Sequence, residues 1–378
     1  MTLKKCRVCS LPLPKSPLLV YRNMPAQAQF LPSKNALARE KGVSLGILQC
    51  SGCGLVQLGG RPVPYYREVI RAAAFSPEMK AFRERQFAAF VKKYGLRGKK
   101  VVEIGCGRGE YLRLMRGAGV KAFGLEYSAA AVRDCVRAGL KVSRGFPGSA
   151  GLRLPHGPFE AFYSLNFLEH LPAPNAVLAA IRANLAPGGT GLVEVPDFGM
   201  MLRENLFSEF IPDHLFYFTA GTLRSLLELN GFDVLECGSV WHGYILSAVV
   251  RKRAPLDLSG FLSAGDSLKS SLLDFVSGFR PGRVAVWGAG HQALAVLALA
   301  GLAGKIKYVV DSAPFKQGKY TPATHLPIVP PARLDEDPVD AVIVMAASYS
   351  GEVAALLRKK YQGRVRIAAL RGSGLQLL

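Results

Sequence analysis

The sequence has no long apolar run. Its most apolar interior stretch, Ala293 to Ala303, is far shorter than the roughly 20 residues that a helix needs to cross a bilayer. No apolar segment of the signal-peptide type follows the opening residues MTLKKC. We therefore expect a cytoplasmic protein with no membrane partner.

Acidic residues are scarce relative to basic ones. Asp and Glu total 27 against 48 Lys and Arg, which gives a net charge of +21. This charge attracts phosphates, whether they belong to a nucleic acid, an anionic surface or a nucleotide-linked small molecule. Because the charge is spread along the chain and forms no Lys/Arg block, we do not expect a nucleic-acid partner. With 378 residues, 49% of them hydrophobic, the chain fits two or three domains.

Cysteine is also sparse, but its spacing is informative. Four of the seven cysteines form two C-x-x-C pairs, Cys6 with Cys9 and Cys50 with Cys53. Two thiolates from each turn can meet at one tetrahedral Zn²⁺, and four thiolates leave no open catalytic position. A cytosolic chain keeps such thiols reduced, which excludes a disulfide framework. We predict a structural zinc domain at residues 1–60, with a metal-free remnant as the alternative.

The insertion between the two cysteine pairs contains a polar, proline-containing segment, Asn23 to Gln29. The sequence leaves open whether this segment faces a ligand or is only an exposed loop.

The centre of the chain reads KVVEIGCGRGEYLRLM, residues 100–115, which predicts a strand, a glycine loop and a helix. The loop glycines let the backbone approach a ligand closely; they are Gly105, Gly107 and Gly109. Glu103 precedes the loop, and Glu126 ends the next strand, where it can accept hydrogen bonds from two ribose hydroxyls. This pattern resembles the first motif of class I S-adenosyl-L-methionine (SAM) methyltransferases. It predicts such a domain at residues 98–252, after a helical connector at residues 61–97 that contains a helix opened by Pro77.

Two later segments carry further candidates. A strand from Phe159 to Leu165 leads into NFLEHL, which brings Asn166 and His170 to the carboxyl edge of the sheet beside the cofactor loop. An aromatic segment at residues 208–219 contains Asp213 and His214. A shielded imidazole beside a carboxylate, which can orient it or raise its pKa, suits a general base. The alternative for His214 is a structural role at the start of the following helix.

The last third of the chain repeats the strand-loop-helix pattern. After a predicted helical linker at residues 253–281, the stretch RVAVWGAGHQA has the form G-x-G-x-x-A, and the next strand ends in Asp311. The pattern alone allows a dinucleotide, but no separate hydride-transfer constellation accompanies it. We predict a second Rossmann-like domain at residues 282–378 that holds substrate or nucleotide, so the whole chain is of the α/β class.

The order of these motifs resembles the sugar C-methyltransferase family. The motifs are the paired C-x-x-C, ExGxGxG, NFLEHL, the acid-His aromatic segment, WGAGHQA and residues 310–320. Members of this family act on nucleotide-linked 4-keto-deoxysugars. The resemblance implies zinc in the N-terminal domain, SAM in the centre and the sugar nucleotide at the C-terminal domain. It implies that His214 removes the proton beside the keto group, so that an enolate carbon attacks the SAM methyl, and that His170 lies near the sugar.

The chain departs from the family at two places. The family's tyrosine-x-glutamate-histidine reads here as residues 211–214, IPDH, so the tyrosine that assists the enolate oxygen is absent. The tyrosine-rich segment before the core reads VIRAAAFS. SAM binding is unaffected, but a related carbohydrate, O-methylation or another phosphate-bearing acceptor stays open. The alternative of another class is a zinc-containing nucleic-acid-binding protein, which would show steep salt dependence and no SAM affinity. The sequence does not indicate the oligomeric state.

Overall fold

The computed structural model describes residues 3–29, 31–68, 76–148, 151–372 and 374–378. Most of the VIRAAAFS segment, residues 69–75, lies outside the described residues. The chain forms two compact units, Met1–Ala254 and Pro255–Leu378, which are considered separately below. Within the described ranges, no helix is both long and apolar enough to cross a membrane.

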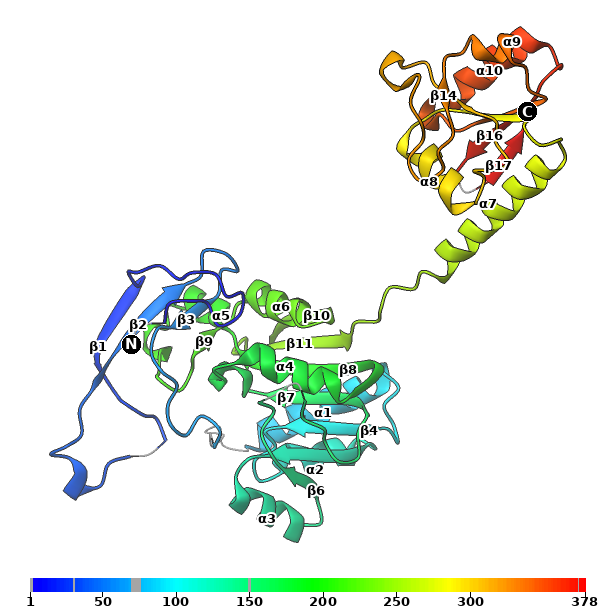
Figure 1. Ribbon diagram of the computed structural model, residues 1–378. Coiled ribbons are helices and arrows are strands. Elements are labelled where there is room, and N and C mark those ends of the chain that lie inside the picture. The colour runs from blue at the N-terminus through cyan, green and yellow to red at the C-terminus, as the bar shows by residue number, and fades with distance from the viewer. Residues whose placement is uncertain (1–2, 30, 69–75, 149–150, 373) are drawn as a thin grey trace. The chain divides into compact units, whose positions relative to one another are not determined.

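A mostly parallel sheet forms the centre of the first unit (Figure 1). Its strands are β4 (Lys100–Ile104), β5 (Lys121–Glu126), β6 (Lys141–Arg144), β7 (Phe159–Leu165), β8 (Leu185–Pro196), β10 (Phe232–Val240) and β11 (Ile245–Lys252). They run in the order β10-β11-β8-β7-β4-β5-β6, with β11 antiparallel to both of its neighbours. The carboxyl ends of β4, β5 and β7 therefore meet at one edge, where such sheets bind ligands.

Helices accompany this sheet. They are α1 (Pro77–Lys93), α2 (Glu110–Gly117), α3 (Ala129–Arg137), α4 (Pro174–Ala183), α5 (Phe198–Arg203) and α6 (Ala220–Leu229), with short 3₁₀ turns η1 (Lys34–Ala36), η2 (Leu168–His170) and η3 (Phe207–Glu209). The predicted start at Pro77 is confirmed: the Ser76 hydroxyl accepts a hydrogen bond from the Met79 N–H and caps α1. Phe87 and Phe90 of α1 are buried in the core, as the helical spacing indicates.

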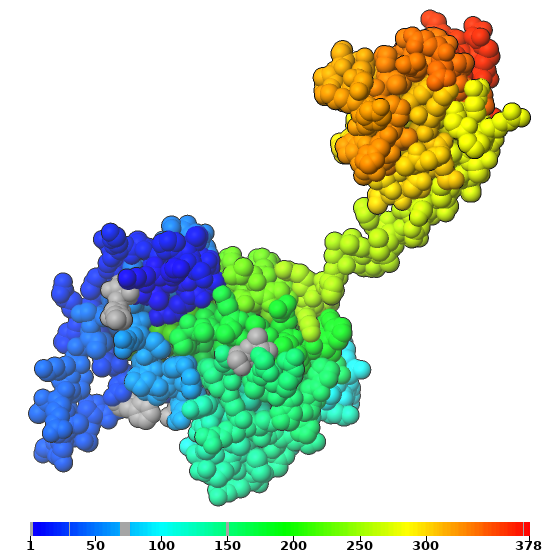
Figure 2. Space-filling view, viewed as in Figure 1, coloured from blue at the N-terminus to red at the C-terminus, as the bar shows by residue number. Residues whose placement is uncertain are grey.

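A second, smaller sheet combines three strands of the N-terminal region with one strand from later in the first unit. Its strands are β1 (Leu19–Met24), β2 (Val43–Gln49), β3 (Val56–Leu58) and β9 (Phe216–Tyr217), in that order. β3, which follows Cys53, pairs with β9, which follows His214 far along the chain. Cys6 and Cys50 share one apolar core with Leu168 and Phe216, and Figure 2 shows the blue N-terminal residues directly against the green ones. Residues 1–60, predicted as a domain of their own, thus share a core with the sheet that follows.

The second unit is also a Rossmann-like α/β fold. Its strands are β12 (Val284–Trp287), β13 (Val309–Val310), β14 (Ile328–Val329), β15 (Ala341–Val344), β16 (Arg366–Arg371) and β17 (Gly374–Leu377), in the order β14-β13-β12-β15-β16-β17. Its helices are α7 (Ser259–Ser277), α8 (His291–Leu299), α9 (Arg333–Glu336) and α10 (Ser350–Tyr361), with 3₁₀ turns η4 (Pro314–Lys316) and η5 (Ala347–Tyr349).

The range predicted as a helical linker, residues 253–281, contains the expected helix, α7, but this helix is part of the second unit. Leu272 and Val276 of α7 are buried in the core of the second unit. The helix belongs to this unit because it buries an apolar stripe there, and the division of the chain falls before it, between Ala254 and Pro255.

Candidate active site and cysteine cluster

One cavity of about 750 Å³ brings together most of the predicted site residues of the first unit. This volume is in the range of small-molecule sites. One group of lining residues surrounds the glycine loop, and we call it the glycine-loop half: Gly105, Gly107, Glu126, Ser128 and Phe146. A second group we call the histidine half: Glu169, His170, Asp213, His214 and Tyr244.

The glycine loop requires glycine for two physical reasons. Gly105, Gly107 and Gly109 have φ values of 74°, 55° and 78°, in the left-handed region that side chains disfavour. A Cβ atom at Gly105 would also lie 3.1 Å from the Phe167 ring. The loop therefore presents bare backbone to the cavity, as the spacing of the glycines predicts.

Glu126 is held rigidly at the end of β5. Its carboxylate accepts hydrogen bonds from the Gly107 N–H at 2.9 Å and from the Ser128 N–H at 2.8 Å. The side chain is nearly buried and lines the cavity. The arrangement fixes an acceptor beside the loop, where a ribose could donate to it.

Glu103 does not face the cavity as the sequence suggested. It is fully buried on β4 and accepts a hydrogen bond from the Tyr163 hydroxyl of β7 at 2.9 Å. These two residues are register partners on neighbouring strands, so the carboxylate is drawn into the sheet. Glu103 therefore links β4 to β7 and is not among the cavity-lining residues of the described chain.

Asn166 contributes a side-chain oxygen to the cavity. Its backbone is left-handed, with φ of 48°, a conformation that asparagine tolerates better than most residues. Its side-chain Oδ1 is buried, lines the cavity and, within the described residues, accepts no hydrogen bond. An unpaired buried acceptor costs about 1–3 kcal/mol, so a donor on a ligand is expected to face it. With the bare loop and Glu126, this orphaned atom fits a ligand that carries ribose hydroxyls and an ammonium group, as SAM does.

The two predicted histidines lie together in the histidine half. Their ring centroids are 4.8 Å apart in an edge-on arrangement. His170 Nδ1 is 2.8 Å from the Asp213 carbonyl oxygen, so Nδ1 carries the proton and Nε2 is left as an acceptor. Burial lowers the pKa of His170, although the Asp213 carbonyl opposes this shift. Burial, and then the neighbouring His170, lower the pKa of His214 to about 3. Both imidazoles are neutral at pH 7.

The predicted pairing of Asp213 with His214 is wrong in its geometry. The Asp213 carboxylate accepts hydrogen bonds from the Tyr65 hydroxyl at 2.9 Å and from the Ala28 N–H at 3.2 Å. The pKa of His214 is lowered, where the sequence suggested that a carboxylate could raise it. Ala28 and Gln29 line the cavity. This favours the ligand-facing alternative over the exposed loop for the segment Asn23 to Gln29. Burial and Asp213 raise the pKa of Tyr65 to about 12.

Sequence reasoning missed Glu169 as a site residue. Its side chain is 1% exposed, it lines the cavity, and its Oε2 has no hydrogen-bond partner in the described structure. Its Oε1 lies 3.8 Å from His170 Nε2. Burial raises the pKa of Glu169 to about 8. The available signal was its position directly before His170 at the sheet edge.

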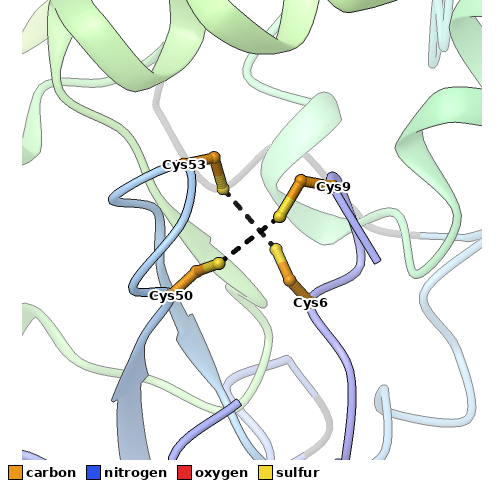
Figure 3. Close-up of side chains that lie close together, drawn as sticks. All are labelled: Cys6, Cys9, Cys50 and Cys53. Atoms are coloured by element: carbon orange, nitrogen blue, oxygen red, sulfur yellow. Dashed lines mark hydrogen bonds between the residues drawn. The ribbon is translucent and has the colours of Figure 1, made fainter. Parts of the chain in front are cut away.

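The four paired cysteines converge as their spacing predicts (Figure 3). The Sγ atoms of Cys6 and Cys53 are 3.6 Å apart, and those of Cys9 and Cys50 are 3.4 Å apart. A tetrahedral zinc with bonds of about 2.3 Å sets its sulfurs roughly 3.8 Å apart, so the cluster is compatible with zinc. Gln57 Nε2 donates to the Cys6 Sγ at 3.2 Å, and hydrogen bonds of this kind orient the ligands of a metal site.

The glycine loop of the second unit has a different environment. The Asp311 carboxylate accepts hydrogen bonds from the Ala289 N–H, the Ala313 N–H and Lys316 Nζ at 2.8–2.9 Å. Although burial opposes it, these donors hold the pKa of Asp311 below its usual value. Glu126 accepts from two comparable backbone N–H groups, so the feature that distinguishes Asp311 is its ion pair with Lys316.

Comparison with known proteins agrees with this site. Residues 79–237 match the model of a methyltransferase domain, and residues 256–368 match the model of a C-methyltransferase C-terminal domain. The protein is a SAM-dependent methyltransferase. This result favours the enzyme over a nucleic-acid-binding protein.

The proteins similar to this methyltransferase include enzymes named as C-methyltransferases and as O-methyltransferases. It is 28% identical over 294 residues to the C-methyltransferase NovU of Streptomyces niveus, covering 70% of each chain. It is 34% identical over 100 residues to the ubiquinone biosynthesis O-methyltransferase of Methylococcus capsulatus, covering 25% of this chain and 42% of that protein. The solved PH0226 protein of Pyrococcus horikoshii OT3 has a TM-score of 0.42 and 18% identity, covering 50% of this chain and 100% of that one.

Proposed function

We propose that the methyltransferase moves the SAM methyl group to a carbon beside the keto group of a nucleotide-linked deoxysugar. The observation that carries this proposal is the placement of two neutral histidines, the buried His170 and the partly buried His214, in the same cavity as the glycine loop. Similarity to a C-methyltransferase over 70% of the chain, and to a C-methyltransferase C-terminal domain, supports methylation at carbon.

The glycine-loop half is the proposed SAM site. Glu126 would accept hydrogen bonds from the ribose hydroxyls, and Asn166 Oδ1 would accept one from the ammonium group. Glu103 would stabilise the strand before the loop through its hydrogen bond with Tyr163. SAM supplies, when bound, an electrophilic methyl group whose bond to sulfur breaks as the nucleophile takes it. The protein therefore has to supply a nucleophile in line with that methyl group.

A carbon nucleophile exists only after a proton beside a carbonyl is removed, so the base decides the reaction. We assign this base to His214, because its lowered pKa leaves one imidazole nitrogen unprotonated at neutral pH. His170 Nε2 is an acceptor and would position a sugar hydroxyl. Asp213 holds His170 through its backbone carbonyl, while Tyr65 fixes its carboxylate, so its proposed role is positioning.

The cysteine cluster is proposed to hold one structural Zn²⁺ through Cys6, Cys9, Cys50 and Cys53. β3 follows Cys53 and pairs with β9, which follows His214. The ion would therefore stabilise the segment that carries the base. The second unit remains the proposed site for the nucleotide part of the acceptor.

The test incubates the enzyme with a 4-keto nucleotide sugar in deuterated water, without SAM. We expect the wild type to exchange the proton beside the keto group for deuterium, as followed by proton NMR. A wild type that methylates a hydroxyl and never catalyses exchange would replace this proposal with O-methylation, the activity named for the ubiquinone-pathway relatives.

A further inference from the structure

The enolate that the proposed function requires carries negative charge on oxygen, and the histidine half needs a hydrogen-bond donor for it. Most polar groups there are already engaged. His170 Nδ1–H donates to the Asp213 carbonyl, the Asp213 carboxylate is an acceptor, and the Tyr244 hydroxyl donates to Glu209. Ile211, which also lines the cavity, offers no side-chain donor.

Apart from the His214 imidazole, which is assigned as the base, Glu169 is the polar group among the described residues of this half whose bonding capacity is unused. Its Oε2 is orphaned although the side chain is 1% exposed, and its Oε1 is beyond hydrogen-bond distance of His170 Nε2, at 3.8 Å. An ionised carboxylate left unpaired in such a place is strongly disfavoured, whereas the neutral acid is tolerated and can donate. The pKa of about 8 that burial gives Glu169 agrees with a protonated side chain at neutral pH.

We propose that Glu169, as the neutral acid, donates a hydrogen bond to the carbonyl oxygen of the acceptor while His214 removes the neighbouring proton. This inference rests on the proposed function. The electron pair of the broken C–H bond forms the enolate double bond, and the π pair of the carbonyl moves to its oxygen. That oxygen accepts from the Glu169 O–H, and the proton resides on the His214 imidazole, so charge is conserved.

An acid and a base of this kind require environments that push their pKa values apart. Burial in the same cavity favours the neutral form of both groups, so it raises the pKa of Glu169 and lowers the pKa of His214. The titratable groups near Glu169 are His170 on its own turn and His214 on the opposite segment. Asp213 contacts His170, and Tyr217 contacts His214.

The competing occupant of this place is a cation. Ligand atoms of Glu169, His170 and His214 lie within 4.8 Å of one another, a donor set that suits a divalent metal. A bound metal would require the ionised carboxylate, which cannot donate. The two alternatives therefore predict opposite protonation states for Glu169.

The experiment compares the wild type with Glu169→Gln, Glu169→Leu and the exposed control Glu204→Gln. The deuterium exchange described above, without SAM, should fall about 10²–10³-fold in Glu169→Leu, the usual effect of removing one oxyanion donor. Glu169→Gln keeps an amide donor and should fall less. The control should match the wild type, and all four proteins should bind SAM equally.

Two further measurements do not depend on turnover. The infrared difference spectrum between the wild type and Glu169→Gln at pH 7 should contain the band of a protonated carboxyl group. Metal analysis should give the same metal content for both proteins. An absent band, or a metal ion lost in the variant, overturns the donor role even if Glu169→Leu fails to fold.

The exchange data also separate this inference from the proposed function. If the wild type exchanges and a folded Glu169→Leu exchanges equally fast, Glu169 is not the donor and the enolate route stands. If the wild type never exchanges, the proposed function is wrong and the donor role is wrong with it.

Discussion

The two halves of the cavity are built in different ways. The glycine-loop half comes mainly from two short stretches of the chain, around residues 105–107 and 126–128, which adjacent parallel strands bring together, with Phe146 beside them. The histidine half joins residues 169–170, 213–214 and 244, and the distant Ala28 and Tyr65 bind its Asp213 carboxylate. A site made of consecutive residues can be recognised from its spacing, whereas a site assembled across the fold depends on pairings that spacing does not record.

The halves also differ in what holds them. Backbone conformation fixes the glycine loop, since its glycines have positive φ. The histidine half depends on the N-terminal region, because β3 pairs with β9 next to His214 and the Ala28 N–H binds Asp213. Perturbing each half in turn should therefore separate SAM binding from acceptor chemistry.

The largest effect is expected for the base. His214→Ala should lose about 10²–10⁴-fold in kcat, as for removal of a general base, while SAM affinity measured by calorimetry stays unchanged. His242→Ala is the matched control, because this exposed histidine binds Glu78 and does not line the cavity. Equal loss in both variants would remove the base assignment.

The second effect breaks the other half. Glu126→Ala removes the acceptor proposed for the SAM ribose and should weaken SAM binding by roughly 1.5–3 kcal/mol, about ten- to a hundredfold. Exchange of the acceptor proton without SAM should continue, since Glu126 lies in the glycine-loop half. Calorimetry that finds unchanged affinity, with Glu228→Ala as the surface control, would contradict the placement of SAM.

The third effect acts through the cysteine cluster. Gln57→Leu removes the N–H donor to the Cys6 sulfur and should lower zinc affinity about tenfold in a chelator competition. Gln49→Leu changes an exposed glutamine on the neighbouring strand β2 and should leave the affinity as it is. Wild-type protein with well under one zinc per chain would exclude the zinc site altogether.

The fourth effect concerns stability and pH. The pKa of Glu169 is raised to about 8 by burial, so its contribution to stability is full below its usual pKa near 4.5 and is lost as pH rises toward 8. Glu169→Gln lacks this loss. The difference in free energy of unfolding, variant minus wild type, should rise with pH between 5 and 8 by at most about 1.4 kcal/mol per pH unit. A flat difference would show that Glu169 is ionised throughout.

Burial lowers the pKa of both His170 and His214, which gives wild-type stability a slope of the opposite sign in more acidic solution. The unfolded chain takes up protons there that the native state refuses, so stability is lost as pH falls below about 6.5. Comparing variant with wild type cancels this shared contribution and isolates Glu169.

Much of the first half could be predicted from sequence. The glycine loop and the strand that ends at Glu126 follow from local spacing, and the structure places both accordingly. The same holds outside the cavity for the convergence of the four cysteines. Glu103 was misjudged because its side chain enters the sheet and pairs with Tyr163, a partner on another strand.

The second half could be predicted only in part. The two histidines were identified, but Asp213 turns to Tyr65 and Glu169 takes the place beside the imidazoles. The sequence distance from Tyr65 to Asp213, and the insertion of β9 beside β3, hide these contacts from any local pattern. The role of each residue in this half remains a prediction.

The most direct test of carbon methylation supplies SAM with a ¹³C-labelled methyl group and examines the product by NMR. The account predicts that the label is bonded to a ring carbon beside the keto group and couples to it when the acceptor is also ¹³C-labelled. A label bonded to oxygen, with no carbon–carbon coupling, would contradict the central claim.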